Sequence, residues 1–380
     1  MEEDTFNSSD QDISKQNLSL SLSIYIYIYI YIYVCVEKEA NRYYSIFFFS
    51  IMAEQSMAVS SVDPSEQFII LRKPDGTITL KYPAPEIPPT GDDIDADVFT
   101  KDVPLNEAKG TSVRIYRPRN ATKGSKLPLI IFYHGGGFIL FSVASLPYNE
   151  QCIRMAREFP AIIVSIDYRL APEHRLPAAY EDGVEAVQWI KNQASGEPWL
   201  RDYVDFSKCF IMGSSAGGTM VYHVALRLYN LGLDQLQPLK IIGLILNQPF
   251  FGAVQRTASE LRLLNDKILP LSSTDLMWDL SLPIGTDRDH EYCNPLPKGL
   301  SELEIKALKS QSCLVCFMGE DPLMDGQKEF MKMLEESGVK FVKYFDEKSY
   351  HAIEIFEPEK GHPGLSKAIK EFIYQSKHGY

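Results

Sequence analysis

The sequence has no block rich in lysine and arginine, no internal repeat and few cysteines. Its formal net charge of −12 argues against nucleic acid or an anionic membrane surface as the main partner and leaves a neutral or cationic small molecule as the easier match. The six cysteines follow no disulfide framework, which suits a reducing compartment. We therefore expect a cytoplasmic protein, a monomer or a homodimer, with a small-molecule partner.

Metal-binding clusters are also lacking. Cys313 and Cys316 have the spacing of a redox or metal pair, but they lie within the apolar run at residues 313–318, and no second Cys/His pair is near. We expect both thiols to pack in the core, and we predict no metal and no organic cofactor.

Residues 1–51 are unlike the rest of the chain. An uncharged run at residues 18–36 alternates Leu-Ser, Ile-Tyr and Val-Cys, and its length would suit a membrane span. The segment before it is acidic, however, whereas a secretory signal begins with positive charge. Such alternating dipeptides are what repeated CT, TA and TG dinucleotides encode. We expect residues 1–51 to be a non-native or disordered leader, with Met52 or Met57 as the natural start; a membrane anchor is the less favoured alternative.

The remaining residues, 52–380, alternate strand-like with helix-like segments. Continuous apolar runs are typical of central strands covered on both faces, and they occur at residues 129–133, 161–166, 209–212, 241–246 and 313–318. Further strands are predicted as a hairpin at 68–80 and at 113–116 and 340–345, and helices at 178–191, 219–226, 330–334 and 365–373. This order predicts a single α/β domain with one mostly parallel, doubly wound sheet. Residues 253–300 interrupt the alternation, and we expect a helical insertion that caps the site.

The stretch Gly213-Ser214-Ser215-Ala216-Gly217 stands between a predicted strand and a predicted helix. A serine with glycine two residues away on each side suits a strained strand-to-helix turn, because both neighbouring backbones can then approach closely. Alone the motif is weak, but its strand and helix context favours Ser215 as a nucleophile.

Three consecutive glycines follow the predicted strand at 129–133, in the stretch His134-Gly135-Gly136-Gly137-Phe138. Glycines destabilise regular elements, so this run indicates that backbone N–H groups turn toward something. We predict an oxyanion hole made by the N–H groups of Gly136, Gly137 and Ala216. A tight strand-exit loop is the plainer alternative, and His134 is expected to orient this loop.

A general base and an acid should follow the serine in the chain. His351 comes shortly after the last predicted strand, and we choose it as the base over His223 and His362. The acid is sought in the stretch 319–325, which follows a buried strand and holds three carboxylates. We choose Asp321, and expect Asp325 and Glu320 to be structural.

Together these stretches resemble one family: HGGGF at 134–138, DYRLAPEHRLPAAYED at 167–182, GSSAGG at 213–218, EDPLMD at 320–325 and the late His351. They are similar to plant carboxylesterases of the hormone-sensitive-lipase group within the α/β-hydrolases. The resemblance implies the α/β-hydrolase fold, the catalytic set Ser215, Asp321 and His351, and a cap formed by residues 52–66 and 253–300. Ala352 departs from the family, in which glycine often follows the histidine.

The implied activity is that of a serine carboxylesterase, which hydrolyses short acyl or acetyl esters of small hydrophobic metabolites through an acyl-enzyme. Phe138, Leu140 and Phe141 are expected to line the pocket. Two alternatives stay open on the same fold: a transesterase or a non-hydrolytic alkaloid-processing enzyme, and a hormone receptor. The retained histidine weighs against the receptor, because such receptors lack it.

Overall fold

The computed structural model describes residues 70–72, 78–80, 84–91, 95–357 and 363–375. Its contacts divide the chain into one unit up to Thr79 and a second from Leu80 onward. Strands β1 (Ile70–Arg72) and β2 (Ile78–Leu80) pair where the hairpin was predicted. The predicted leader and the N-terminal part of the predicted cap, residues 52–66, lie outside the described residues.

The second unit contains one eight-stranded sheet, whose strands lie in the order β10-β9-β8-β7-β5-β6-β4-β3. Its strands are β3 (Val98–Asn106), β4 (Thr111–Pro118), β5 (Leu127–Tyr133), β6 (Ile162–Asp167), β7 (Val204–Ser214), β8 (Ile241–Asn247), β9 (Ser312–Glu320) and β10 (Val342–Tyr350). The six strands from β5 to β10 run parallel. Strand β4 pairs antiparallel with β6, and β3 pairs antiparallel with β4. The predicted α/β fold with a mostly parallel sheet is confirmed.

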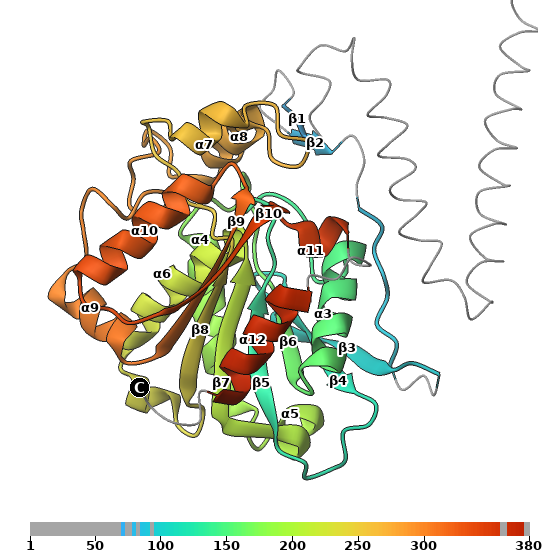
Figure 1. Ribbon diagram of the computed structural model, residues 1–380. Helices are drawn as coiled ribbons and strands as arrows, with labels where there is room; N and C mark the ends of the chain where they lie inside the picture. The colour runs from blue at the N-terminus through green and yellow to red at the C-terminus, as the bar shows by residue number, and fades with distance from the viewer. Residues whose placement is uncertain (1–69, 73–77, 81–83, 92–94, 358–362, 376–380) are drawn as a thin grey trace, which may run out of the picture. The chain divides into compact units, whose positions relative to one another are not determined.

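Helices cover both faces of this sheet, as Figure 1 shows. The described helices are α3 (Leu146–Glu158), α4 (Ala178–Asn192), α5 (Pro198–Tyr203), α6 (Ala216–Leu231), α7 (Ala258–Arg262), α8 (Leu271–Ser281), α9 (Glu302–Lys309), α10 (Met324–Glu336), α11 (Ile353–Phe356) and α12 (Pro363–Gln375), with the 3₁₀ turn η3 (Leu233–Leu236). Helices α4, α6 and α10 lie on one face, and α3 and α12 on the other. None of the helices in this described part combines the length and apolarity needed to cross a bilayer.

Burial explains why the central strands were easy to predict. All residues of β5 after Leu127 are buried, and β8 and β9 are buried over almost their whole length. The apolar side chains of β5, β7 and β9 on one face join those of α3 and α12 in a single core cluster. The thiols of Cys313 and Cys316 belong to this buried strand layer, and burial raises the pKa of Cys313 to about 12. Their place in β9 agrees with core packing.

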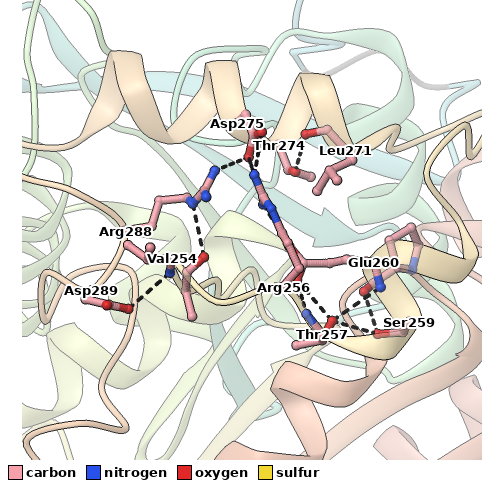
Figure 2. A network of polar contacts seen from close by, with 12 residues as sticks. Val254, Arg256, Thr257, Ser259, Glu260, Leu271, Thr274, Asp275, Arg288 and Asp289 are labelled. Carbon is pink, nitrogen blue, oxygen red and sulfur yellow. Dashed lines mark hydrogen bonds and ion pairs between the residues drawn. The ribbon is translucent and has the colours of Figure 1, made fainter.

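The inserted segment at residues 253–300 is only partly helical: α7 and α8 are its two helices, and turns join them. Its parts are tied together by the polar network of Figure 2. The carboxylate of Asp275 in α8 accepts hydrogen bonds from Arg256, with Nη2 at 2.6 Å from Oδ2, and from Arg288. Arg288 also donates to the carbonyl of Ala253 at 3.0 Å. One carboxylate thus holds together the start, the middle and the end of the insertion.

Asp275→Ala leaves two half-buried guanidinium groups without their shared acceptor. We expect a loss of about 1–2 kcal/mol in the free energy of unfolding, since several charges share this network. Faster amide hydrogen exchange in α8 should accompany it. The control Glu291→Ala breaks an exposed pair with Lys298 and should cost less than about 0.5 kcal/mol. If urea unfolding showed the same loss of free energy of unfolding in both variants, Asp275 would not have the stabilising role described here.

Candidate active site

Ser215 is the residue between the end of β7 and the start of α6, and its backbone is strained. It has φ 55° and ψ −120°, a conformation that costs a non-glycine residue about 1–3 kcal/mol. The glycines two residues away permit this turn, because a Cβ atom on Gly213 would lie 2.1 Å from the carbonyl oxygen of Gly217. A Cβ atom on Gly217 would lie 2.0 Å from the carbonyl oxygen of Tyr133. No larger residue fits at either position.

The side chains of Ser215, His351 and Asp321 form one hydrogen-bonded row. His351 Nε2 lies 3.0 Å from Ser215 Oγ, and His351 Nδ1 lies 2.9 Å from Asp321 Oδ2. All three residues are buried. Because a carboxylate only accepts hydrogen bonds, the proton of the neutral imidazole sits on Nδ1, and the lone pair of Nε2 faces the hydroxyl. The three residues predicted from distant parts of the chain therefore meet at the carboxyl ends of the strands.

Asp321 is fixed by further donors. The N–H of Leu323 donates to Oδ1 at 2.8 Å, and Gln327 Nε2 lies 3.3 Å from Oδ2. Together with His351 these donors satisfy a carboxylate that has no exposed surface. They leave Asp321 little freedom to turn away from the ring.

The imidazole pKa reflects two opposing effects. Burial of His351 lowers the pKa, but the charge and hydrogen bond of Asp321, with the charges of Glu354 and Asp266, outweigh burial, so the pKa of His351 is raised above its usual 6.5. The ring is thus a stronger base than a free histidine.

The predicted oxyanion donors share one geometric feature, which is that the carbonyl of each donor peptide is held. In a planar trans peptide the N–H points away from the carbonyl, so a held carbonyl aims the N–H. His134 Nδ1 donates to the carbonyl of Gly135 at 2.8 Å, which aims the N–H of Gly136. The N–H groups of Ile139 and Leu140 donate to the carbonyl of Gly136 and so aim the N–H of Gly137.

The third donor peptide follows the same rule. The carbonyl of Ser215 accepts from Thr219 at 3.2 Å and from Phe250 at 3.0 Å, and this aims the N–H of Ala216. Within the described part of the chain, the N–H groups of Gly136, Gly137 and Ala216 donate no hydrogen bond. These three N–H groups are available to an oxygen atom that binds beside Ser215.

His134 is a support of this loop rather than a proton donor or acceptor in a reaction. Burial lowers its pKa to about 4, so its ring is neutral and its Nδ1 proton is committed to Gly135. The ring stacks on Tyr168 with 4.3 Å between centroids, and the Tyr168 hydroxyl donates to the carbonyl of His134 at 2.8 Å. This placement agrees with the orienting role expected for His134.

The chain is similar to known α/β-hydrolases in sequence and in fold. A family model described as alpha/beta hydrolase fold matches residues 130–354. Probable carboxylesterase 8 of Arabidopsis thaliana is 47% identical over 82% of this chain and 94% of its own length. The chain belongs to the α/β-hydrolase family. 3-O-acetylpapaveroxine carboxylesterase CXE2 of Papaver somniferum is 44% identical over 82% of this chain and 99% of its own. The solved esterase of Pyrobaculum calidifontis is 28% identical, with a TM-score of 0.61 over 73% of this chain and 84% of its own.

These relatives place this α/β-hydrolase among the plant carboxylesterases, and it is a carboxylic ester hydrolase. The resemblance seen in the sequence motifs is confirmed.

The residues expected to line the pocket of this α/β-hydrolase have different surroundings. Phe138 is almost fully buried and packs against the rings of Tyr180, Phe250 and Trp278. It therefore supports the glycine loop from behind. Leu140 is buried, and Phe141 is half-buried against Tyr148.

Helix α8 also contacts the glycine loop directly. Ser281 Oγ donates to the carbonyl of Gly137 at 3.1 Å, and a Cβ atom on Gly137 would lie 2.3 Å from Met277 Sδ. The inserted segment is thus built into the support of the predicted oxyanion hole, although its role as a cap stays a prediction.

Other candidate residues are accounted for. His223 stacks on Tyr180 inside the fold, with 4.4 Å between ring centroids, and His362 lies outside the described residues. Asp325 accepts from the N–H of Ser259 at 2.8 Å. Glu320 pairs with Arg262. One local difference is that β10 runs to Tyr350, so His351 follows this strand directly instead of after a short loop.

Sequence reasoning missed the segment Asn247-Gln248-Pro249-Phe250, which contacts every part of the site. The carbonyl of Asn247 accepts the N–H of Ser215 at 2.9 Å, and the Gln248 side chain accepts the N–H of Ala352 at 2.7 Å. The carbonyl of Pro249 accepts from Gln327, which also reaches Asp321. The available signal was an amide residue at the end of the buried strand β8 and a second directly after it, at the edge where ligands bind in parallel sheets.

Gly217→Ala tests the close approach at the turn. The added Cβ atom would collide with backbone atoms of Tyr133 and His134, so we expect a loss of more than about 3 kcal/mol of stability. The matched control is Gly326→Ala in α10, where the nearest atom lies 3.9 Å away and helix propensity favours alanine by about 1 kcal/mol. Thermal unfolding compares the two variants, and a stable Gly217→Ala protein would contradict the packing described for this turn.

Proposed function

We propose that this carboxylic ester hydrolase uses Ser215 as a nucleophile and passes through an acyl-enzyme, with His351 as general base and Asp321 as its partner. The observation that carries this proposal is the continuous row of hydrogen bonds from Ser215 through His351 to Asp321. In this arrangement a proton can leave the hydroxyl as the oxygen attacks a carbonyl carbon.

In the first step Ser215 Oγ attacks the ester carbonyl, and its proton moves to His351 Nε2. The carbonyl oxygen becomes negative, and the N–H groups of Gly136, Gly137 and Ala216 stabilise it. Loss of one such donor typically costs about 10²–10³ in turnover. The imidazolium then gives its proton to the leaving alkoxide, and an alcohol departs.

The second step repeats the first with water. His351 takes a proton from water as the water oxygen attacks the acyl-enzyme carbonyl. The imidazolium then returns this proton to Ser215 Oγ as the tetrahedral intermediate collapses, which releases the acid and restores the Ser215 hydroxyl. The Asp321 carboxylate stabilises the imidazolium in both steps without taking the proton.

We propose short acyl or acetyl esters of small hydrophobic metabolites as substrates. Two observations support this class. The relative from Papaver somniferum is named for an acetylated substrate. The apolar side chains of Phe141 and Met277 lie against Gly136 and Gly137, and neither carries a charge that would bind an ionic acyl group.

Ser215→Ala tests the nucleophile. We expect hydrolysis of p-nitrophenyl acetate and butyrate to fall by about 10⁴-fold or more, with the fold and the melting temperature retained. Ser207→Ala is the control, because this exposed serine lies on the same strand and bonds only to its neighbour Asp205. Mass spectrometry of the protein after brief mixing with substrate should show an acyl adduct in the Ser207→Ala protein alone. Substantial turnover by Ser215→Ala would refute the role of this hydroxyl.

The pH dependence of kcat/KM tests the base. His351 must be neutral to accept a proton, and its pKa is raised, so activity should fall as the pH drops through a midpoint above 6.5. At pH values well above this midpoint, kcat/KM should reach its maximum. A pH-stat assay with p-nitrophenyl acetate measures it, with the base uptake corrected for the p-nitrophenol product, which itself titrates near neutral pH. A midpoint below about 6 would contradict a base held by Asp321.

A further inference from the structure

A second carboxylate follows His351 in the chain, and its charge acts on the imidazole. Glu354 lies in α11, three residues after His351, and it is half-buried. Asn247 Nδ2 lies 2.6 Å from its Oε1, and Gln248 Nε2 lies 3.0 Å from its Oε2. Each carboxylate oxygen thus receives one amide donor from the end of strand β8.

Both amides are buried, so their hydrogen bonds must be made inside the protein. Asn247 Nδ2 also donates to Ser214 Oγ at 3.0 Å, and Gln248 Oε1 accepts the N–H of Ala352 at 2.7 Å. This network therefore runs from the residue before Ser215 to the residue after His351. The ionised carboxylate accepts from both amides and presents no donor to either, whereas an amide side chain at position 354 would have one acceptor oxygen beside an NH₂ donor.

The contact with Ala352 fixes the base directly. The N–H of Ala352 belongs to the same planar peptide as the carbonyl of His351, and Ala352 has the left-handed conformation with φ 57°. Holding this N–H fixes the peptide that leaves His351. Arg154 of α3 adds a hydrogen bond of 2.7 Å to the carbonyl of Glu354.

We propose that Glu354 is a positioning residue: its carboxylate holds the Asn247 and Gln248 amides in place, fixes the His351–Ala352 peptide beside Ser215, and favours the imidazolium that forms during the reaction. This inference rests on the proposed role of His351 as general base. Glu354 itself contacts neither the reacting hydroxyl nor the imidazole nitrogen atoms in the hydrogen bonds described above.

Charge supports the geometry. Burial lowers the pKa of His351, Asp321 raises it most, and Glu354 and then Asp266 raise it further. The titratable and charged groups that face the imidazole or Glu354 are Asp321, Asp266, Arg154, Tyr148, Cys316 and Tyr350. Removing the charge of Glu354 should therefore lower the pKa of His351.

Glu354→Gln removes this charge and leaves one acceptor oxygen for the side-chain amides of Asn247 and Gln248. We expect kcat for p-nitrophenyl acetate to fall about tenfold with KM changed less than about twofold, because positioning acts on the transition state. The acid midpoint of kcat/KM should move to lower pH by about 0.3–1 unit, since a less stabilised imidazolium loses its proton at lower pH.

Gln248→Met separates the clamp from the charge. It keeps the Glu354 carboxylate but frees the N–H of Ala352, so we expect a similar fall in kcat with an acid midpoint within about 0.2 unit of the parent. The control Glu371→Gln removes one charge from an exposed position of α12, where Glu371 pairs with Lys367 among the described residues, and should change neither quantity.

Three results decide the proposal. An unmoved acid midpoint in Glu354→Gln would overturn it even if kcat fell, because a distorted fold alone lowers kcat. Parent-like kcat in Gln248→Met would also overturn it, and this variant decides the question if Glu354→Gln does not fold. His351→Ala, measured in parallel, distinguishes the two proposals: if it keeps hydrolysis, the proposed function fails, whereas an inactive His351→Ala with parent-like Glu354→Gln refutes only the inference on Glu354.

Discussion

The strained backbone of Ser215 is the constraint on which the rest of the site depends. Its conformation puts the hydroxyl out of the sheet edge, toward His351, and it leaves the N–H of Ala216 at the start of α6 without an intrahelical partner. A strained turn persists only where its surroundings over-determine it. Here the N–H and the carbonyl of Ser215 are both held, by Asn247 and by Phe250 and Thr219, and glycines at 213 and 217 let neighbouring backbones close around it.

The segment at residues 247–250 connects the strained turn at Ser215 to the residues around Asp321 and His351. It leaves the carboxyl end of β8, next to the strand that carries Ser215, and it contacts the loops after β9 and β10. Gln327 bonds both Pro249 and Asp321, and Gln248 bonds Ala352 beside His351. The three side chains of the row therefore come from three loops but share one backbone support. This segment therefore links the supports of Ser215, His351 and Asp321.

The sequence was informative where a physical requirement leaves a local trace. Only glycine fits at 213 and 217, long apolar runs mark strands buried on both faces, and Asp321 and His351 each follow a strand. Strand β3 and helices α3, α5 and α9 were not predicted, because β3 alternates weakly and these helices mix polar and apolar residues. The contact of Asn247 and Gln248 with Glu354 leaves no pattern in the sequence, since the two amides meet this carboxylate only after the sheet has formed. Phe138 shows the converse, because an aromatic residue next to a site can equally face the core.

In the proposed mechanism, anchored carbonyls would let backbone N–H groups act on a charge that forms only briefly. In water, solvent dipoles would have to turn toward a new oxyanion, and that reorganisation costs free energy at the moment of reaction. Here the peptides of Gly136, Gly137 and Ala216 are already turned, because His134, Ile139, Leu140, Thr219 and Phe250 hold their carbonyls in the folded protein. The free-energy cost of holding these peptides in place arises when the protein folds. It lies in the burial of His134 and in the strained backbone of Ser215. The same reasoning applies to Glu354: a carboxylate that is fixed by two amides before the imidazole gains its proton need not move when the positive charge appears.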